Sequence, residues 1–291
     1  MPVPLVENAP AKVNLTLRVL KRRDDGYHEI ESLVAFADFG DRLSFSRGGK
    51  LTLAVHGPAA PQAGEGEDNL VLKAARALAA VRPGIALGAF SLDKRLPVAA
   101  GLGGGSADAG AALRLIAQAN GLARNDPQLY AAARATGADV PVCLDPRARI
   151  MRGIGEVLSE PLALPQLPAV LVNPGVALPT KAVFAEWRPA ATPAAALDLA
   201  IAKPTSHARL LQLLAAQSND LEGPAIALAP VIAEVLAALR AQPGCLLARM
   251  SGSGATCFAL FSSADQAVAA EKLLLRQQPA WWVKATMLGD G

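Results

Sequence analysis

The stretch that decides the fold reads KRLPVAAGLGGGSADA and occupies residues 94–109. Four of the five residues from Gly101 to Gly105 are glycines. Because glycine has no Cβ, backbone N–H groups there can turn toward one centre and let an anion approach closely. Apolar residues recur at helical spacing from Ser106 onward, and a helix beginning there adds unpaired N–H groups and the positive end of its dipole. The stretch therefore predicts a phosphate cradle at residues 102–106, with the Ser106 hydroxyl available to a phosphate or its Mg²⁺.

Three better-known glycine loops fail on individual residues. A Rossmann fingerprint needs glycine where Ser106 stands, and a Walker A loop needs lysine after its last glycine. A nucleophile elbow around Ser106 needs glycine at the position of Asp108. The remaining alternative is a flexible glycine linker before an ordinary helix. The proline-bounded strand before the loop and the amphipathic helix after it favour the phosphate loop.

Around this loop the chain predicts an α+β fold. Residues 12–20 alternate between apolar and polar side chains, as in a half-buried strand with one solvated face. The other elements follow from hydrophobic runs, turn signals and caps. We expect strands near residues 30–36, 43–45, 51–55, 85–92, 169–172, 245–250, 256–261 and 282–287, and helices near residues 71–78, 106–119, 127–136, 180–187, 207–217, 224–241 and 264–277.

The proline-rich segment 161–168 is the expected domain boundary. It separates an N-terminal domain, residues 1–160, from a C-terminal domain, residues 161–291. The Ala/Pro-rich segment 189–196 is expected to be a surface loop.

Composition excludes several classes of protein. Of the 291 residues 52% are hydrophobic and 18% charged, which is enough apolar material for a packed core and argues against disorder. The net charge of +3 comes from mixed acids and bases without a basic stripe, so we expect no nucleic-acid partner. Three scattered cysteines and three histidines predict neither a disulfide framework nor a metal cluster. No signal peptide and no apolar run of about 18 residues is present, so we expect a soluble cytoplasmic protein without a membrane span.

Three motifs together resemble the GHMP kinase superfamily, which includes galactokinase and the homoserine and mevalonate kinases. They are PAKVNL at residues 10–15, the loop at residues 96–109 and MSGSGA at residues 250–255. The loop departs from the commonest family form at residues 98–100, where Met and Gly are more usual. DGYHE at residues 25–29 and TGADVP at residues 136–141 are similar to one branch of the superfamily. That branch phosphorylates the 2-hydroxyl of a cytidine diphosphate-linked methylerythritol in the non-mevalonate route to isoprenoids.

The resemblance implies a two-domain architecture with the active site between the domains. The N-terminal domain would have a ribosomal-protein-S5-like fold and the C-terminal domain a ferredoxin-like α+β fold. ATP would enter as its Mg²⁺ complex, with no permanently bound metal. The implied ATP-binding residues are Asn69, Pro97, Ala99, Ala100, Gly101, Leu102, Gly103, Gly104, Gly105, Ser106 and Ala107. Asn69 would contact the adenine, although it is also a good helix N-cap.

Two residues gain a catalytic role from the resemblance. By itself, Asp139 is as readily an N-cap after a glycine-terminated helix, and Lys12 is more readily a surface lysine. Matched to the family motifs, Asp139 becomes the acceptor of the hydroxyl proton. Lys12 becomes the partner that keeps Asp139 ionised and neutralises developing charge.

The substrate residues implied by the motifs divide into two groups. Asn14, on the same side of its strand as Lys12, would hydrogen-bond the erythritol hydroxyls. Tyr27 and Phe184 would form the two sides of a cytosine sandwich, with His28 at the edge of the base.

Thr180, Ser251 and Gly252 complete the substrate set. Each has an ordinary alternative: a helix cap for Thr180 and a plain hairpin loop for Ser251 and Gly252. Phe184 in an amphipathic helix is likewise commonly a core residue.

The expected function is ATP-dependent phosphorylation of the cytidine diphosphate-bearing alcohol. One alternative is another kinase of the superfamily, of the homoserine or mevalonate type, which would not need an aromatic clamp. Another is a non-catalytic nucleotide-binding regulator, which would keep the glycine loop without needing Lys12 and Asp139. The sequence leaves the oligomeric state open.

Overall fold

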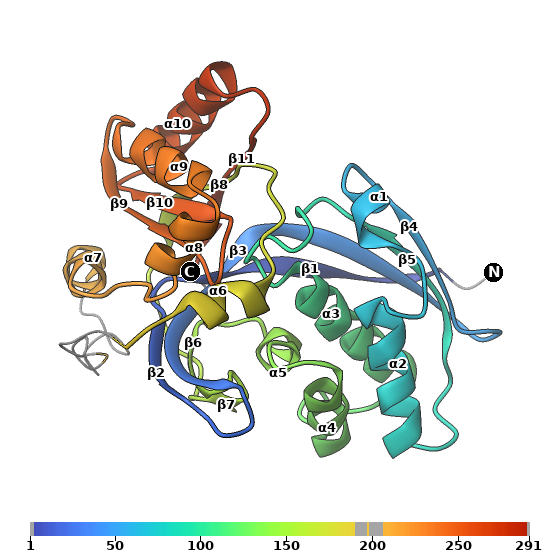
Figure 1. Ribbon diagram of the computed structural model, residues 1–291. Helices are drawn as coiled ribbons and strands as arrows, with labels where there is room; N and C mark the ends of the chain where they lie inside the picture. Colours follow the sequence, from blue (N-terminus) through green and yellow to red (C-terminus); the bar gives the residue numbers. More distant parts are fainter. Residues whose placement is uncertain (1–2, 190–196, 198–205, 290–291) are drawn as a thin grey trace. The chain divides into compact units, whose positions relative to one another are not determined.

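The computed structural model describes residues 3–189, 197 and 206–289 (Figure 1). Residues 190–196, most of the segment expected to be a surface loop, lie outside this description. The described chain is a mixed α+β structure, as the sequence predicts. None of its helices is long and apolar enough to cross a lipid bilayer.

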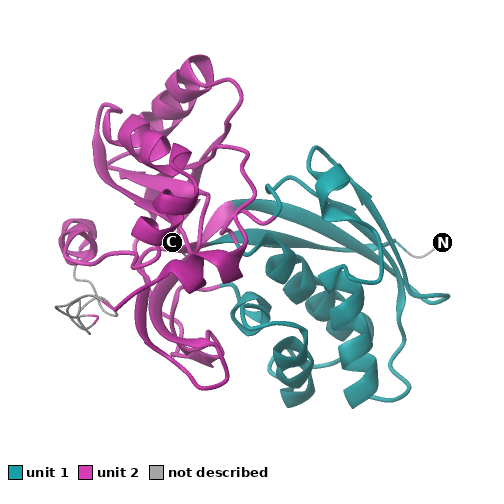
Figure 2. Cartoon of the chain, viewed as in Figure 1, with its two compact units in different colours: residues 1–12, 39–98, 103–146 teal, residues 13–38, 99–102, 147–291 magenta. Residues whose placement is uncertain are grey.

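Two compact units make up the chain, and each is built from separate stretches of sequence (Figure 2). Unit 1 holds residues 1–12, 39–98 and 103–146, and unit 2 holds residues 13–38, 99–102 and 147–291. Strands β1 (Leu5–Asn14) and β3 (His28–Arg47) each contribute residues to both units. The compact units therefore differ from the single division near residue 160 expected from the sequence, because two long strands pass through both.

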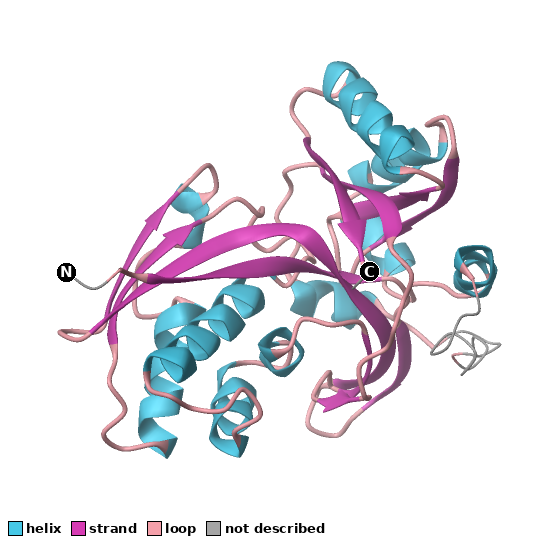
Figure 3. Ribbon diagram, turned by 180° about the vertical axis from the view of Figure 1, so that it is seen from behind, coloured by secondary structure: helices cyan, strands magenta, loops and turns pink. Residues whose placement is uncertain are grey.

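Unit 1 combines a short sheet with helices. The second half of β3 pairs antiparallel with β5 (Gly88–Asp93), and β5 pairs parallel with β4 (Thr52–His56). Within this unit, Figure 3 shows the longer helices gathered on one face of the strands. The helices are α1 (Ala60–Ala63), α2 (Leu70–Val81), α3 (Gly104–Ala119), α4 (Pro127–Thr136) and α5 (Val140–Leu144). Helix α3 packs against α2 and α5, which places the helix that follows the glycine loop at the centre of the unit.

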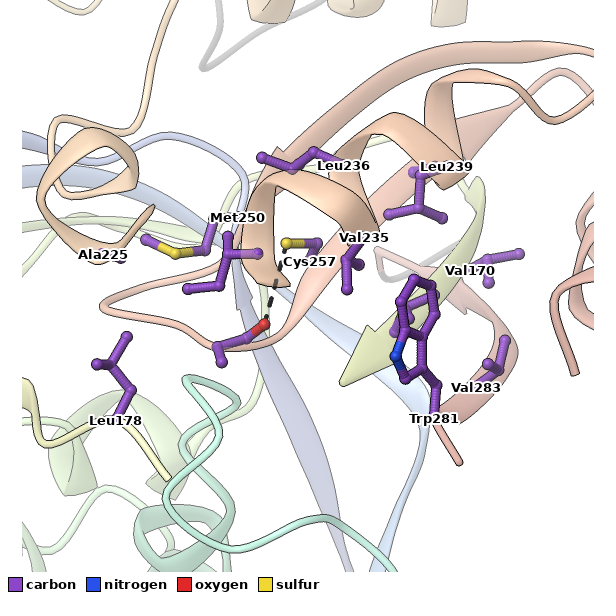
Figure 4. Packing of buried hydrophobic residues seen from close by; sticks show 14 of the residues in the cluster. Val170, Leu178, Ala225, Val235, Leu236, Leu239, Met250, Cys257, Trp281 and Val283 are labelled. Carbon is purple, nitrogen blue, oxygen red and sulfur yellow. Dashed lines mark hydrogen bonds between the residues drawn. The ribbon is translucent and has the colours of Figure 1, made fainter. Parts of the chain in front are cut away.

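Unit 2 holds an antiparallel sheet in the order β11-β8-β10-β9. Its strands are β8 (Leu167–Asn173), β9 (Cys245–Met250), β10 (Cys257–Phe261) and β11 (Trp282–Leu288). Helices α9 (Val231–Arg240) and α10 (Ala264–Gln277) pack on these strands. Figure 4 shows the core they enclose, where Leu236, Leu239 and Val235 of α9 lie near Cys257.

The remaining elements of unit 2 precede and interrupt this sheet. The first half of β3 pairs with β2 (Arg18–Arg22) and with β6 (Arg149–Gly153), and β6 pairs with β7 (Val157–Leu158). Among the described residues, three helices lie between β8 and α9 in sequence: α6 (Thr180–Glu186), α7 (His207–Ala215) and α8 (Glu222–Leu228).

Two expected elements differ from the structure for identifiable reasons. The strand expected over residues 12–20 is divided between β1 and β2, and the polar side chains of Lys12, Asn14 and Thr16 are buried rather than solvated. Thr16, for example, accepts a hydrogen bond from the Leu33 N–H at 3.0 Å. The helix expected over residues 224–241 is divided into α8 and α9, with Pro230 as the N-cap of α9, because proline cannot donate the hydrogen bond that a continuous helix requires.

Candidate active site

The second half of the glycine loop forms the start of helix α3 in unit 1. The helix begins at Gly104, two residues earlier than expected, so Ser106 lies in its first turn. Gly103 is the N-cap in the left-handed conformation, with φ of 60°. A Cβ at Gly103 would also lie 3.1 Å from Cε of Lys12. Glycine is therefore required here both for the backbone conformation and for the close passage of a lysine.

Lys12 reaches from β1 to this glycine and to Asp139. Its Nζ lies 3.3 Å from Oδ2 of Asp139, which stands at the N-cap of α5. The Asp139 side chain makes no capping hydrogen bond, so its carboxylate is directed to the lysine and not to the helix. The Lys12 side chain is 4% exposed and that of Asp139 is 39% exposed. A buried cation thus faces a carboxylate that solvent, and so a substrate, can reach.

A second buried lysine lies below the next glycine of the loop. Nζ of Lys94 is 2.5 Å from Oδ2 of Asp41 and 2.6 Å from Oδ2 of Asp108, and a Cβ at Gly104 would lie 3.1 Å from it. Burial alone would lower the pKa of Lys94, but the two carboxylates outweigh it and raise that pKa. Burial raises the pKa of Asp108 to about 7, against the opposing effect of Lys94. The sequence motifs give Lys94 and Asp108 no role; the available signal was the one acidic residue of a helix rich in alanine and leucine.

The first half of the loop is fastened within unit 2 to the second glycine loop, residues 251–254. The carbonyl of Ala100 accepts the Thr256 N–H at 3.0 Å, and the carbonyl of Gly101 accepts the Ser251 hydroxyl at 3.0 Å. The Ser251 hydroxyl in turn accepts the N–H of Asn14 at 3.0 Å. Both bonds of this buried hydroxyl go to main-chain groups, so Ser251 holds the two glycine loops together; its expected contact with the substrate stays a prediction.

Asn219 supports the same loop and was missed by sequence reasoning. Its side-chain amide donates to the carbonyls of Met250 and Gly252, each at 2.8 Å, and its Oδ1 accepts the N–H of Leu221 at 3.0 Å. The sequence around Asn219 is typical of a helix start. Only its long-range hydrogen bonds show that Asn219 also anchors the second glycine loop.

Asn14 is buried in unit 2 with a polar neighbour. Its amide donates to the Ser32 hydroxyl at 2.7 Å, and its Oδ1 would lie 3.3 Å from a Cβ placed on Gly252. The structure therefore brings together three of the expected substrate residues, Asn14, Ser251 and Gly252.

Two aromatic residues contact His28 in unit 2. The ring of Phe184 packs on it, with centroids 4.9 Å apart, and the cytosine sandwich expected between Tyr27 and Phe184 stays a prediction. Trp187, which sequence reasoning missed although it lies three positions after Phe184, meets His28 edge-on at 5.7 Å. Tyr27 is 58% exposed. Partial burial, with a smaller effect of Arg22, lowers the pKa of His28, which favours a neutral ring.

Two further expected site residues have structural partners. The Thr180 hydroxyl shares a hydrogen bond of 2.9 Å with the Ser253 hydroxyl, and the N-cap of α6 is Pro179 instead. Asn69 caps α2, since its Oδ1 accepts the Val71 N–H at 2.9 Å while its amide donates to the Gly64 carbonyl at 2.9 Å. Asn69 therefore acts as the N-cap of α2, the role that its sequence context also allowed.

The other expected ATP-binding residues lie along the loop with different exposure. Pro97, Gly103, Gly104 and Ser106 are half-buried, Ala99 and Gly105 are exposed, and Ala100, Leu102 and Ala107 are buried. Ala99 adopts a positive φ of 53°. Among the residues that the structure describes, no group of three or more His, Cys, Asp or Glu is arranged to hold a metal ion.

Comparison with known proteins places this geometry in context. The family model for the GHMP kinases N terminal domain matches residues 69–145, and that for GHMP kinases C terminal matches residues 199–277. The 4-diphosphocytidyl-2-C-methyl-D-erythritol kinase of Xanthobacter autotrophicus is 56% identical over 285 residues, covering 96% of this chain and 97% of that protein. The kinase of the same name from Methylobacterium radiotolerans is 57% identical over 291 residues, covering 98% and 99%.

Solved structures agree with these relatives. A crystal structure of 4-(cytidine 5'-diphospho)-2C-methyl-D-erythritol kinase is 36% identical and superimposes with a TM-score of 0.78, covering 99% of this chain and 100% of that one. The homoserine kinase of Cytophaga hutchinsonii, at 20% identity and a TM-score of 0.72, covers 98% and 95% and shares the fold.

Proposed function

From the membership of this chain in the GHMP kinase family, among its 4-diphosphocytidyl-2-C-methyl-D-erythritol kinases, we propose the following reaction. The enzyme transfers the γ-phosphoryl group of ATP to the 2-hydroxyl of 4-diphosphocytidyl-2-C-methyl-D-erythritol, a step of the non-mevalonate isoprenoid pathway. The single observation that carries this proposal is the ion pair of Lys12 and Asp139 beside Gly103 of the phosphate loop.

The ion pair supports a simple division of labour. The acceptor hydroxyl oxygen attacks the γ-phosphorus, the bond from that phosphorus to the departing ADP oxygen breaks, and the hydroxyl proton passes to Asp139. Asp139 suits this role because its carboxylate makes no capping bond and is partly open to solvent. Lys12 suits charge neutralisation because its ammonium is buried, where electrostatic interactions are less screened than in water.

The start of α3 is the proposed phosphate cradle. Gly103, Gly104 and Gly105 lack side chains at the point where helix N–H groups are unpaired, so phosphate oxygens can approach the backbone closely. Mg²⁺ would arrive bound to ATP, neutralising phosphate charge, and the Ser106 hydroxyl in the first turn of α3 would be a protein oxygen able to hold it.

The aromatic cluster of unit 2 is the proposed cytidine site. His28 contacts both Phe184 and Trp187, and an exposed Tyr27 precedes them in sequence. Base–aromatic stacking and hydrogen bonds from a neutral imidazole would suit a cytosine ring. Replacing Trp187 with Ala should raise the KM of the cytidine substrate about tenfold without changing that of ATP.

The proposal also includes where in the cell the reaction takes place and where the two family domains meet in the sequence. We place the reaction in the cytoplasm, because ATP is supplied there and Cys143, Cys245 and Cys257 form no disulfide. We retain residue 160 as the approximate family boundary, which is supported by the two family models on either side of it.

The direct test is product formation from ATP, Mg²⁺ and 4-diphosphocytidyl-2-C-methyl-D-erythritol, followed by mass spectrometry. Homoserine and mevalonate serve as competing acceptors. We expect kcat/KM for the cytidine substrate to exceed that for either competitor by about a hundredfold or more, because only it engages the aromatic cluster. Preference for homoserine or mevalonate would assign the chain to another kinase of the superfamily. Binding of ATP without turnover of any acceptor would indicate a regulator.

A further inference from the structure

The buried cluster of Lys94, Asp41 and Asp108, here called the loop staple, is not used by the proposed reaction. All three side chains are nearly inaccessible, with exposures of 4%, 0% and 4%. Lys94 contacts both carboxylates within 2.6 Å. A buried ion cluster is costly to desolvate, so its position below the phosphate loop indicates a role in the function of that loop.

The staple connects the chain that enters the loop with the chain that leaves it. Oδ1 of Asp41, on β3, accepts the N–H groups of Arg95 at 2.6 Å and Leu96 at 2.8 Å. Asp108 lies in α3, the helix that follows the loop. Lys94 joins Asp41 to Asp108, so the residues immediately before the loop are tied to the second turn of the helix after it.

The position of Lys94 excludes a direct phosphate contact and favours an indirect role. Its ammonium donates to two carboxylates and is shielded from solvent. It lies next to Gly104, whose missing Cβ leaves only 3.1 Å to the lysine Nζ. A glycine-rich segment loses more conformational entropy on ordering than any other. A fixed support beneath it therefore lowers the entropy cost of ordering the loop when a ligand binds.

We propose that Lys94, Asp41 and Asp108 are positioning residues that hold the phosphate loop in its anion-binding conformation by tying residues 94–96 to helix α3. This inference rests on the proposed ATP site. Cutting the tie on the helix side loosens Gly104, Gly105 and Ser106 and weakens nucleotide binding, while the proposed cytidine site in unit 2 is unaffected.

Asp108→Ala is the decisive variant. It removes the bond to α3 but leaves the compensated pair of Lys94 and Asp41, and alanine is the best helix former, so the fold is retained. We expect its Kd for Mg²⁺–ADP, measured by calorimetry, to rise about tenfold, and the KM of the cytidine substrate to stay within about twofold. Amide hydrogen exchange of the peptide covering residues 99–110 should accelerate at the same time.

Two further variants separate position from charge and from sequence neighbourhood. Asp108→Asn removes the charge but keeps an oxygen for Lys94, and should restore most of the lost affinity. Arg95→Ala is the matched control, because Arg95 is adjacent to Lys94 and also pairs with an aspartate, Asp93, but with its side chain 44% exposed. We expect its ADP affinity to equal that of the wild type.

The outcomes distinguish this inference from the proposed function. Wild-type affinity in Asp108→Ala, or a loss in Asp108→Asn as large as in Asp108→Ala, would overturn the positioning role while leaving the kinase assignment intact. Failure of the wild-type protein to bind Mg²⁺–ADP would instead overturn the proposed ATP site.

Discussion

Lys12 and Lys94 are two buried lysines of unit 1 that lie against consecutive glycines of the same loop. Each has a side chain 4% exposed and each pairs with aspartate. The difference is in the partners: Asp139, opposite Lys12, is 39% exposed at 3.3 Å, whereas Asp41 and Asp108, opposite Lys94, are at most 4% exposed within 2.6 Å. In the pair of Lys12 and Asp139 the carboxylate is accessible to solvent, and we call this the open pair. In the cluster around Lys94 no charged group is accessible, and we call this the closed cluster.

This difference separates chemistry from architecture. A carboxylate that exchanges protons with a substrate must be reachable and must keep unused hydrogen-bonding capacity. A charge cluster that fixes a backbone is most effective when its groups satisfy one another and exclude water. Partner exposure, more than the burial of the lysine, therefore indicates which of two similar ion pairs acts on the substrate.

The largest expected effect comes from breaking the open pair. Asp139→Asn should lower kcat by about 10²- to 10⁴-fold, because the amide cannot accept the proton, while the Kd for Mg²⁺–ADP stays within about twofold. A matched control is Asp126, another helix N-cap, whose side chain does accept a backbone bond, from Gln128.

Asp126→Ala should have the opposite profile in steady-state assays and thermal denaturation. It should lose about 1 kcal/mol of stability with the cap and keep its activity. Normal turnover of Asp139→Asn would show that this carboxylate is not the proton acceptor.

The second effect comes from breaking the closed cluster. Lys94→Met leaves two buried carboxylates without their cation and should lower the free energy of unfolding by about 3–5 kcal/mol. Lys12→Met should lower the free energy of unfolding much less, because solvent can hydrate the exposed carboxylate of Asp139. Relative to this small loss of stability, its effect on kcat should be far larger than that of Lys94→Met. Urea denaturation with matched m-values provides the measurement; equal destabilisation by the two substitutions would remove the distinction between the pairs.

Local signals in the sequence predict much of the fold. The cap at Asn69, the proline start of α4 at Pro127 and the bounds of α10 follow from neighbouring residues, and the structure confirms them. The buried polar face at residues 14–16 could not be predicted in this way. Alternation reports that two faces differ in polarity, but only tertiary contacts decide whether the polar face is solvated.

The candidate site divides along the same line. Motifs identify the glycine loop, Lys12 and Asp139, and the structure brings Lys12 next to both, although their catalytic roles remain predictions. The loop staple and Asn219 depend on partners that lie far away in sequence: Asp41 lies 53 residues before Lys94, and Met250 lies 31 residues after Asn219. No local pattern specifies such pairings.

A smaller effect should sharpen the comparison through the two glycines. Gly103→Ala forces an L-residue into the left-handed region, at about 1–2 kcal/mol, and presses on Cε of Lys12. Because that methylene would shift and carry the ammonium of Lys12 away from its position beside Asp139, we expect kcat to fall about tenfold. The ADP affinity should be largely kept.

Gly104→Ala is the paired variant and should affect the other lysine. Its backbone is helical, but a Cβ would lie 3.1 Å from a lysine Nζ fixed by two carboxylates. We therefore expect a loss of ADP affinity of about tenfold with a smaller change in kcat at saturating ATP. Calorimetry and initial-rate kinetics test both variants, and identical profiles would show that the loop responds as one body rather than as two separately supported glycines.

The smallest effect concerns pH and tests whether the closed cluster is fully compensated. Burial raises the pKa of Asp108 to about 7 from an ordinary 3.8, so the folded protein binds this proton more tightly than the unfolded chain. The stabilising contribution of the protonated carboxyl is complete below about pH 4 and is lost as the pH rises through about 7. Since Lys94 offsets part of the charge, we expect Asp108→Asn to gain on the order of 1 kcal/mol of stability over the wild type between pH 5 and pH 8. Urea denaturation at both pH values measures this difference, and a parallel pH dependence in the two proteins would mean that the staple holds Asp108 ionised throughout.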